Sequence, residues 1–118
     1  MDNLTDQWHR AIALFNAQEF YTCHDLLEEI WHNAPMDDRQ FYQGILQIAV
    51  GLYHLQRQNI RGAMGLLGTG ISNLRAFHPH YHRIDVSHLV AESYTIWQNL
   101  QTNQLPSRLP QILPIDAE

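Results

Sequence analysis

Apolar residues recur along the chain at intervals of three and four, which is the spacing of one face of an α-helix. The first stripe consists of Leu4, Trp8, Ala11, Ile12 and Phe15, and the second of Phe20, Cys23, Leu27, Ile30 and Trp31. Because few residues separate the two stripes, they predict a helical hairpin. Pro35 is expected to end the second helix, since proline disfavours helical backbone in the residue before it.

The next apolar segment predicts a third helix, from residue 37 or 38 to about residue 59. Its apolar residues cover most of the helix circumference, and a helix of this kind is buried by its neighbours. We therefore expect it at the centre of the fold. The spacing predicts a fourth helix over residues 60–77, a loop over 78–83 and a fifth helix from Asp85 or Ser87 to Leu100.

No strand pattern competes with these helices, and no change in composition marks a second domain. The expected fold class is all-α: a single compact bundle of about five helices over residues 1–104, packed as antiparallel hairpins. Residues 105–118 contain Pro106, Pro110 and Pro114, which exclude a regular helix there. The apolar residues of this tail predict that it packs on the domain, and a strap that extends from it to bind a partner is the alternative.

Charge and composition exclude several classes of function. The 118 residues carry 12 acidic side chains, 7 arginines and no lysine, for a formal net charge of −5. This balance argues against nucleic acid and anionic membrane surfaces, which need clustered positive charge. The missing lysine excludes a Schiff-base enzyme and a phosphate-binding P-loop. No segment approaches the roughly 18 apolar residues of a membrane span, and no secretory signal is recognisable, so we expect a cytoplasmic protein.

Polar residues interrupt the apolar surface of the central helix. Gln43, Gln47 and His54 project within about 40° of one another when a helix turns by about 100° per residue. Burying an unpaired amide or imidazole costs about 1–3 kcal/mol, so each of these side chains needs a partner.

The second helix offers a matching set of polar residues. His24 and Glu28 are separated by one helical turn, and Trp31 falls close to them. If the second and third helices pack side by side, these residues converge with the polar strip of the third helix. The sequence thus predicts one shared site between the two helices.

Two interpretations of this site compete. In the structural one, Glu28 orients His24 and the glutamine amides tie two helices together. In the functional one, the residues line a small-ligand pocket or form a metal-dependent or general-base hydrolase. His24 and His54 would then serve as base or ligand, with Glu28 as partner, while Gln43 and Gln47 position substrate or water. A divalent metal is compatible with this set, but no metal site is assigned.

The same residues carry a family resemblance. The run from Phe20 to Trp31, followed by residues 43–47 and the pair Tyr53-His54, resembles the signature of the family called domain of unknown function 309. The resemblance covers about residues 10–90 and implies a compact all-helical domain. It picks out His24, Glu28, Trp31, Gln43, Gln47 and His54, and we add Tyr53 as a binding residue. Asp25 replaces a glutamate of the family's pattern, so no role is assigned to it.

The reaction stays open, because the resemblance brings no established activity. A non-enzymatic helical domain is the first hypothesis, the hydrolase the second, and a protein-interaction module that uses a helical groove and the proline-rich tail the third. Any uncovered apolar face would favour a homodimer of twofold symmetry.

Two further features have ordinary interpretations. The alternate histidines of residues 78–82 could share a metal in an extended chain, but a solvated loop is the favoured interpretation. The four glycines of residues 62–70 predict close contact between the fourth helix and a neighbour.

Overall fold

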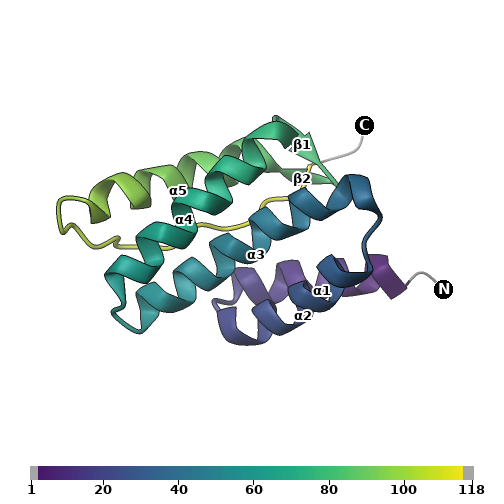
Figure 1. Cartoon of the computed structure of the whole chain (residues 1–118), viewed down its shortest axis with the longest axis horizontal. Coiled ribbons are helices and arrows are strands. Elements are labelled where there is room, and N and C mark those ends of the chain that lie inside the picture. Colours follow the sequence, from purple (N-terminus) through teal and green to yellow (C-terminus); the bar gives the residue numbers. More distant parts are fainter. Residues whose placement is uncertain (1–2, 116–118) are drawn as a thin grey trace.

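Five stretches of the part of the chain that the structure describes, residues 3–115, are α-helical in this computed structural model. They are α1 (Asn3–Asn16), α2 (Phe20–Asn33), α3 (Met36–Gln56), α4 (Ile60–Leu74) and α5 (Val86–Leu100) (Figure 1). A 3-10 turn (Arg75–Phe77) follows α4. The two-residue strands β1 (His80–Tyr81) and β2 (Ile84–Asp85) then form an antiparallel hairpin. The all-α prediction is confirmed, and the hairpin corrects the expectation that no strand forms.

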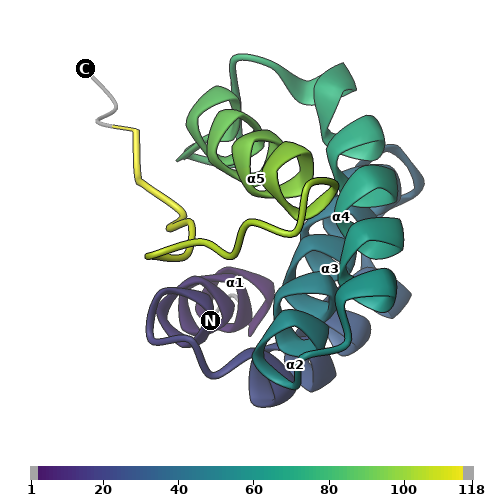
Figure 2. The ribbon, with the colours of Figure 1, turned by 90° about the vertical axis from the view of Figure 1, so that its left-hand side faces the viewer.

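The helices form two layers. Figure 2 shows α3 between α2 and α4 in one layer, with α1 and α5 on the other side. Ile45, Ile48 and Leu52 of α3 are completely buried, so the prediction of a central third helix is confirmed. Within residues 3–115, no helix combines the length and apolar composition that a membrane span requires.

Side chains cap the N-terminal ends of α4 and α5. Asn59 precedes α4, and its side-chain oxygen accepts a hydrogen bond from the main-chain N–H of Gly62 at 3.0 Å. Asp85 accepts the N–H of His88 at 2.9 Å at the start of α5, and this bond lowers the pKa of its carboxyl group. Both caps satisfy main-chain donors that the first helical turn leaves unpaired.

Glycines let α3 and α4 pack closely. A Cβ atom on Gly70 would lie 2.9 Å from the carbonyl oxygen of Gly44 and 3.0 Å from the side chain of Ile48. The expectation of close contact is confirmed at this position. It is wrong for Gly65, because a Cβ atom there would meet nothing within 4 Å.

These two glycines give a matched prediction. Gly65→Ala is expected to raise the free energy of unfolding by about 0.5–1 kcal/mol, because alanine restricts the unfolded chain and favours helix. Gly70→Ala is expected to lower it by about 1–3 kcal/mol, because the main chain of α3 must move away. Urea denaturation of both variants checks the pair. Equal effects would mean that the helices do not meet at Gly70.

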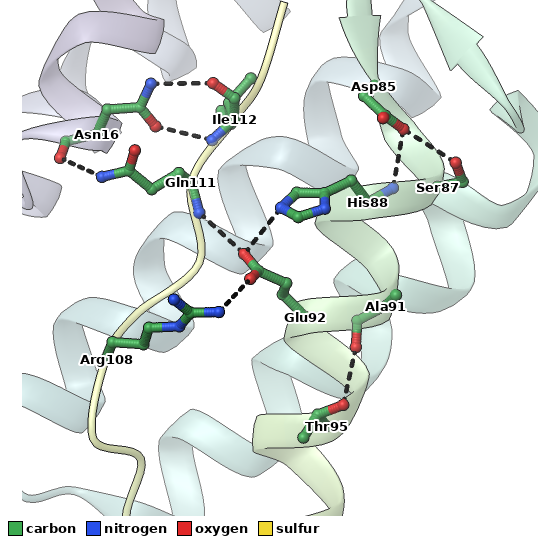
Figure 3. Close-up of polar contacts among 10 residues, drawn as sticks. All are labelled: Asn16, Asp85, Ser87, His88, Ala91, Glu92, Thr95, Arg108, Gln111 and Ile112. Carbon is green, nitrogen blue, oxygen red and sulfur yellow. Dashed lines mark hydrogen bonds and ion pairs between the residues drawn. The ribbon is translucent and has the colours of Figure 1, made fainter.

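The C-terminal tail closes the bundle. In Figure 2 it runs between α1 and α5. The side chain of Asn16, at the end of α1, donates to the carbonyl oxygen of Ile112 at 2.9 Å and accepts from its N–H at 2.7 Å (Figure 3). Further along, Ile115 donates its N–H to the carbonyl of Arg83 at 2.9 Å, beside the hairpin. Ile112 is buried, so the tail supplies part of the core.

Glu92 of α5 anchors the other side of the tail (Figure 3). Its carboxylate lies 3.2 Å from Nε2 of His88 and 3.7 Å from the guanidinium of Arg108, and it accepts the main-chain N–H of Gln111 at 3.3 Å. His88 thus lies beside the carboxylate that holds the tail.

Candidate functional site

The polar residues of α2 lie along its exposed edge. Nδ1 of His24 is 3.2 Å from the carboxylate of Asp25, and Nε2 is 3.6 Å from that of Glu28. Both carboxylates are mostly exposed, and exposed pairs of this kind contribute little to stability. His24 thus belongs to a local surface group within α2.

A row of rings connects α2 with α3. The ring of Tyr21 has its centroid 5.9 Å from that of His24 and 5.5 Å from that of Tyr53. The ring of Tyr53 lies 6.0 Å from that of His54. Two tyrosine rings therefore stand between the two histidines in this row of contacts.

Two members of the polar strip on α3 are paired toward α4. Oε1 of Gln47 accepts a hydrogen bond from Nδ2 of Asn73 at 2.7 Å. Nδ1 of His54 lies 3.2 Å from the side-chain amide of Asn59, the residue that caps α4. The partners that we expected on α2 are thus found on α4 and on the connection before it.

The remaining predicted residues lie apart from these pairs. Gln43 is exposed. The ring of Trp31, which is half-buried, lies 4.5 Å from the guanidinium carbon of Arg39 in a cation–π contact. The structure therefore distributes the predicted site residues over several local groups along α2 and α3.

The described residues include neither a cluster of metal ligands nor an exposed thiol. Within residues 3–115, no cluster of three His, Cys, Asp or Glu side chains could hold a metal ion. Cys23 is buried and donates to the carbonyl of Ala11 at 3.4 Å. Burial raises the pKa of its thiol to about 12, so the thiol stays protonated and unreactive at neutral pH. Cys23, which belongs to the second apolar stripe, is thus a core residue.

A cleft of about 630 Å³ lies elsewhere, between α1, α3, the β1–β2 hairpin and the tail. It is lined by Leu4, Thr5, Trp8, His9, Ile12, Asn16, Tyr42, His82, Arg83, Ile84, Ile112, Pro114 and Ile115. Most of these side chains are apolar or aromatic, and a few polar groups accompany them. Sites for small organic molecules typically have this composition and a volume of about 300–1,000 Å³.

Three stacked or edge-on rings give the cleft a rigid wall. The rings of Trp8 and Tyr42 meet edge to face at 5.3 Å, and the ring of His82 stacks on Tyr42 at 5.5 Å. The indole N–H of Trp8 donates to the carbonyl oxygen of His82 at 3.1 Å. This bond joins α1 to the hairpin.

The carboxylate of Asp38 contacts two residues of the β1–β2 hairpin. One carboxylate oxygen lies 3.1 Å from Nε2 of His82, and the other accepts the phenolic O–H of Tyr81 at 2.5 Å. This hydrogen bond is the main reason why the pKa of Tyr81 is raised to about 12. The expectation of a solvated loop is wrong for His82, because Asp38 and Tyr42 fix its imidazole against the domain.

The hairpin turn adopts an uncommon backbone. His82 has φ 46° and Arg83 has φ 65°, as a two-residue turn of the type I′ class requires. Such turns usually contain asparagine or glycine, and other residues pay about 1–2 kcal/mol each for this conformation. A metal site shared by the histidines of residues 78–82 requires an extended chain, in which alternate side chains face the same way. The positive φ of His82 departs from that extended backbone. Backbone strain of this kind is concentrated at functional sites.

Sequence analysis did not single out this cleft. Its residues come from four segments far apart along the chain, so no local spacing could bring them together. Trp8 belongs to the first apolar stripe and is also a core residue, with 6% of its surface exposed. One available signal was the apolar tail, whose burial implied a surface on the domain that receives it.

Comparison with known proteins places the chain in a family. Residues 8–66 match the family described as Domain of unknown function (DUF309). The matched segment includes Trp8 and Tyr42 and ends within α4, before the hairpin. A similar relative is "Uncharacterized protein YpuF" of Bacillus subtilis (strain 168), 32% identical over 104 residues. The alignment covers 86% of this chain and 59% of the relative, so the chain spans about three fifths of that protein's length.

Proposed function

We propose a function from the geometry of this chain itself, because the chain belongs to the DUF309 family, whose description names no activity. The domain acts as a binding module for a small organic molecule with an apolar body. The site is the cleft between α1, the β1–β2 hairpin and the tail. The observation that carries this proposal is the 630 Å³ cleft walled by Trp8, Tyr42 and His82.

The construction of the cleft supports a preformed site. Asp38 fixes one end of the hairpin, the indole of Trp8 bonds to the turn, and Asn16 holds the tail on the opposite side. Walls that are already ordered lose little conformational entropy when a ligand enters, so more of the contact energy appears as affinity.

Filling the cleft tests this function. Ile12 lines the cleft and is partly exposed, whereas Ala13 is exposed on the same helix and does not line it. We expect 1-octanol, titrated into the protein by calorimetry, to bind saturably to the wild type and to the Ala13→Trp variant. Ile12→Trp should abolish this binding while the melting temperature stays close to that of Ala13→Trp. Saturable binding that survives Ile12→Trp, or none to the wild type, would overturn the proposal.

For Gln47 and His54 of α3 we propose a structural role. The pairing of Gln47 with Asn73 and of His54 with Asn59 supports it. His54→Ala is expected to lower the free energy of unfolding by about 1 kcal/mol, because it removes a contact of Asn59, the residue that caps α4. His24→Ala should be nearly neutral, since its ion pairs are exposed. Loss of an esterase activity in His24→Ala, with unchanged stability, would favour the hydrolase hypothesis instead.

The net charge bears on partners of other kinds. The net charge of −5 has the same sign as phosphate backbones and anionic lipid surfaces, which attract positively charged proteins. We therefore propose a small molecule as ligand in preference to a nucleic acid or a membrane surface. A homodimer stays a prediction that sedimentation of the purified protein can check.

A further inference from the structure

The charge around the cleft differs from that of the whole chain. The protein has 12 acidic residues and a net charge of −5. Among the described residues that line the cleft, however, the ionisable groups of cationic type are His9, His82 and Arg83, and none is Asp or Glu. The net charge of the chain repels an anion, whereas the ionisable groups at the cleft are of the type that attracts one.

Arg83 is the principal source of this positive charge. Nε2 of His82 already lies 3.1 Å from the carboxylate of Asp38. Within residues 3–115, no carboxylate lies within ion-pair distance of Arg83. Its main chain is fixed by the strained turn and by the hydrogen bond from the N–H of Ile115 at 2.9 Å. Arg83 thus lines an apolar cleft as an exposed residue, and its guanidinium has no internal partner in the described part of the chain.

We propose that the ligand of the cleft is an amphipathic carboxylate, an aliphatic or aromatic acid. This inference rests on the proposed function and names its ligand class. The apolar body of the acid packs against Trp8, Ile12 and Ile115, and its carboxylate pairs with Arg83. A guanidinium presents two parallel N–H donors that match the two oxygens of one carboxylate. A neutral molecule of the same shape forms no ion pair with Arg83.

The test compares octanoate with 1-octanol on the folded full chain by calorimetry at low ionic strength. Arg83→Gln removes the charge at the cleft, and glutamine already tolerates positive φ at Gln18 and Gln58. Arg10→Gln is the matched control, because Arg10 is exposed on α1, changes the net charge equally and does not line the cleft. We expect octanoate to bind the wild type more tightly than octanol. Arg83→Gln should weaken octanoate about fivefold, as for one partly exposed ion pair, and leave octanol unchanged.

The outcomes separate this inference from the proposed function. Tighter octanoate binding that depends on Arg83 and not on Arg10 supports both. Octanol binding that equals or exceeds octanoate binding, with no effect of Arg83→Gln, overturns the carboxylate and leaves the cleft as a site for neutral molecules. An equal loss in Arg10→Gln and Arg83→Gln also overturns it, because the attraction is then a long-range effect of net charge. Failure of both probes to bind removes the proposed function as well.

Discussion

Replacing Ile112 by alanine is expected to lower the free energy of unfolding by about 2–5 kcal/mol, the range found when a buried isoleucine is truncated. Ile112 is 1% exposed and reaches the core from the C-terminal tail. Its main-chain N–H and carbonyl both bond to the side chain of Asn16, and alanine keeps these bonds. The loss therefore measures the buried side chain alone. Guanidinium denaturation at constant pH is the measurement.

Leu113 provides the control for this prediction. It is the next residue of the tail, but 36% of its surface is exposed. Leu113→Ala should therefore cost well under half as much as Ile112→Ala, since the lost energy follows the apolar area removed from water. Two small and equal losses would show that the tail does not form part of the folded core. The tail could then not form a wall of the cleft.

Asp38→Ala is expected to lower the free energy of unfolding by about 1.5–3 kcal/mol, the range for hydrogen bonds that involve a charged group. The substitution removes the acceptor of the Tyr81 hydroxyl and the carboxylate beside His82 together. Asp37→Ala is the matched control. Asp37 lies in the same first turn of α3, so both variants lose the same favourable interaction with the helix dipole, but its side chain is exposed.

Titration of Tyr81 checks the same contact independently. The hydrogen bond to Asp38 favours the neutral phenol, so the folded pKa, about 12, lies above the ordinary value near 10. The stabilisation is complete below about pH 10 and is lost as the pH rises toward 12. Asp38→Asn should move the pKa of Tyr81 back toward the ordinary tyrosine value, followed by ultraviolet absorbance. An unchanged titration would contradict the contact.

Local pattern was sufficient to predict the helices. The apolar stripes of α1 and α2, the proline before α3 and the nearly uniform apolar surface of α3 each reflect interactions within a few turns of chain. Helix ends also followed local chemistry, as at Asp85, which caps α5. The fourth helix was expected to reach Phe77, but α4 ends at Leu74 and continues as a 3-10 turn. An apolar residue such as Phe77 fits either geometry.

The candidate site required information that a helix pattern does not contain. The polar strip of α3 lies on a helix that packs against both α2 and α4. The angular position of Gln47 on this helix does not decide which of the two neighbours supplies its hydrogen-bond partner. The structure pairs it with Asn73 of α4. His82 shows the same limit, since its contacts with Tyr42 and Asp38 depend on a turn of positive φ whose sequence, His-Arg, is unusual for that conformation.

The three tryptophans test the location of the binding site most directly. Trp8 lines the cleft, Trp31 lies beside Arg39 on the outer edge of α2 and α3, and Trp97 belongs to α5. Their indole N–H signals in a ¹H–¹⁵N spectrum, assigned by single Trp→Phe substitutions, can be followed while octanoate is added. The account predicts a saturable shift of the Trp8 signal with the other two unchanged. A shift of the Trp31 signal with Trp8 unmoved, or no shift at all, would contradict it.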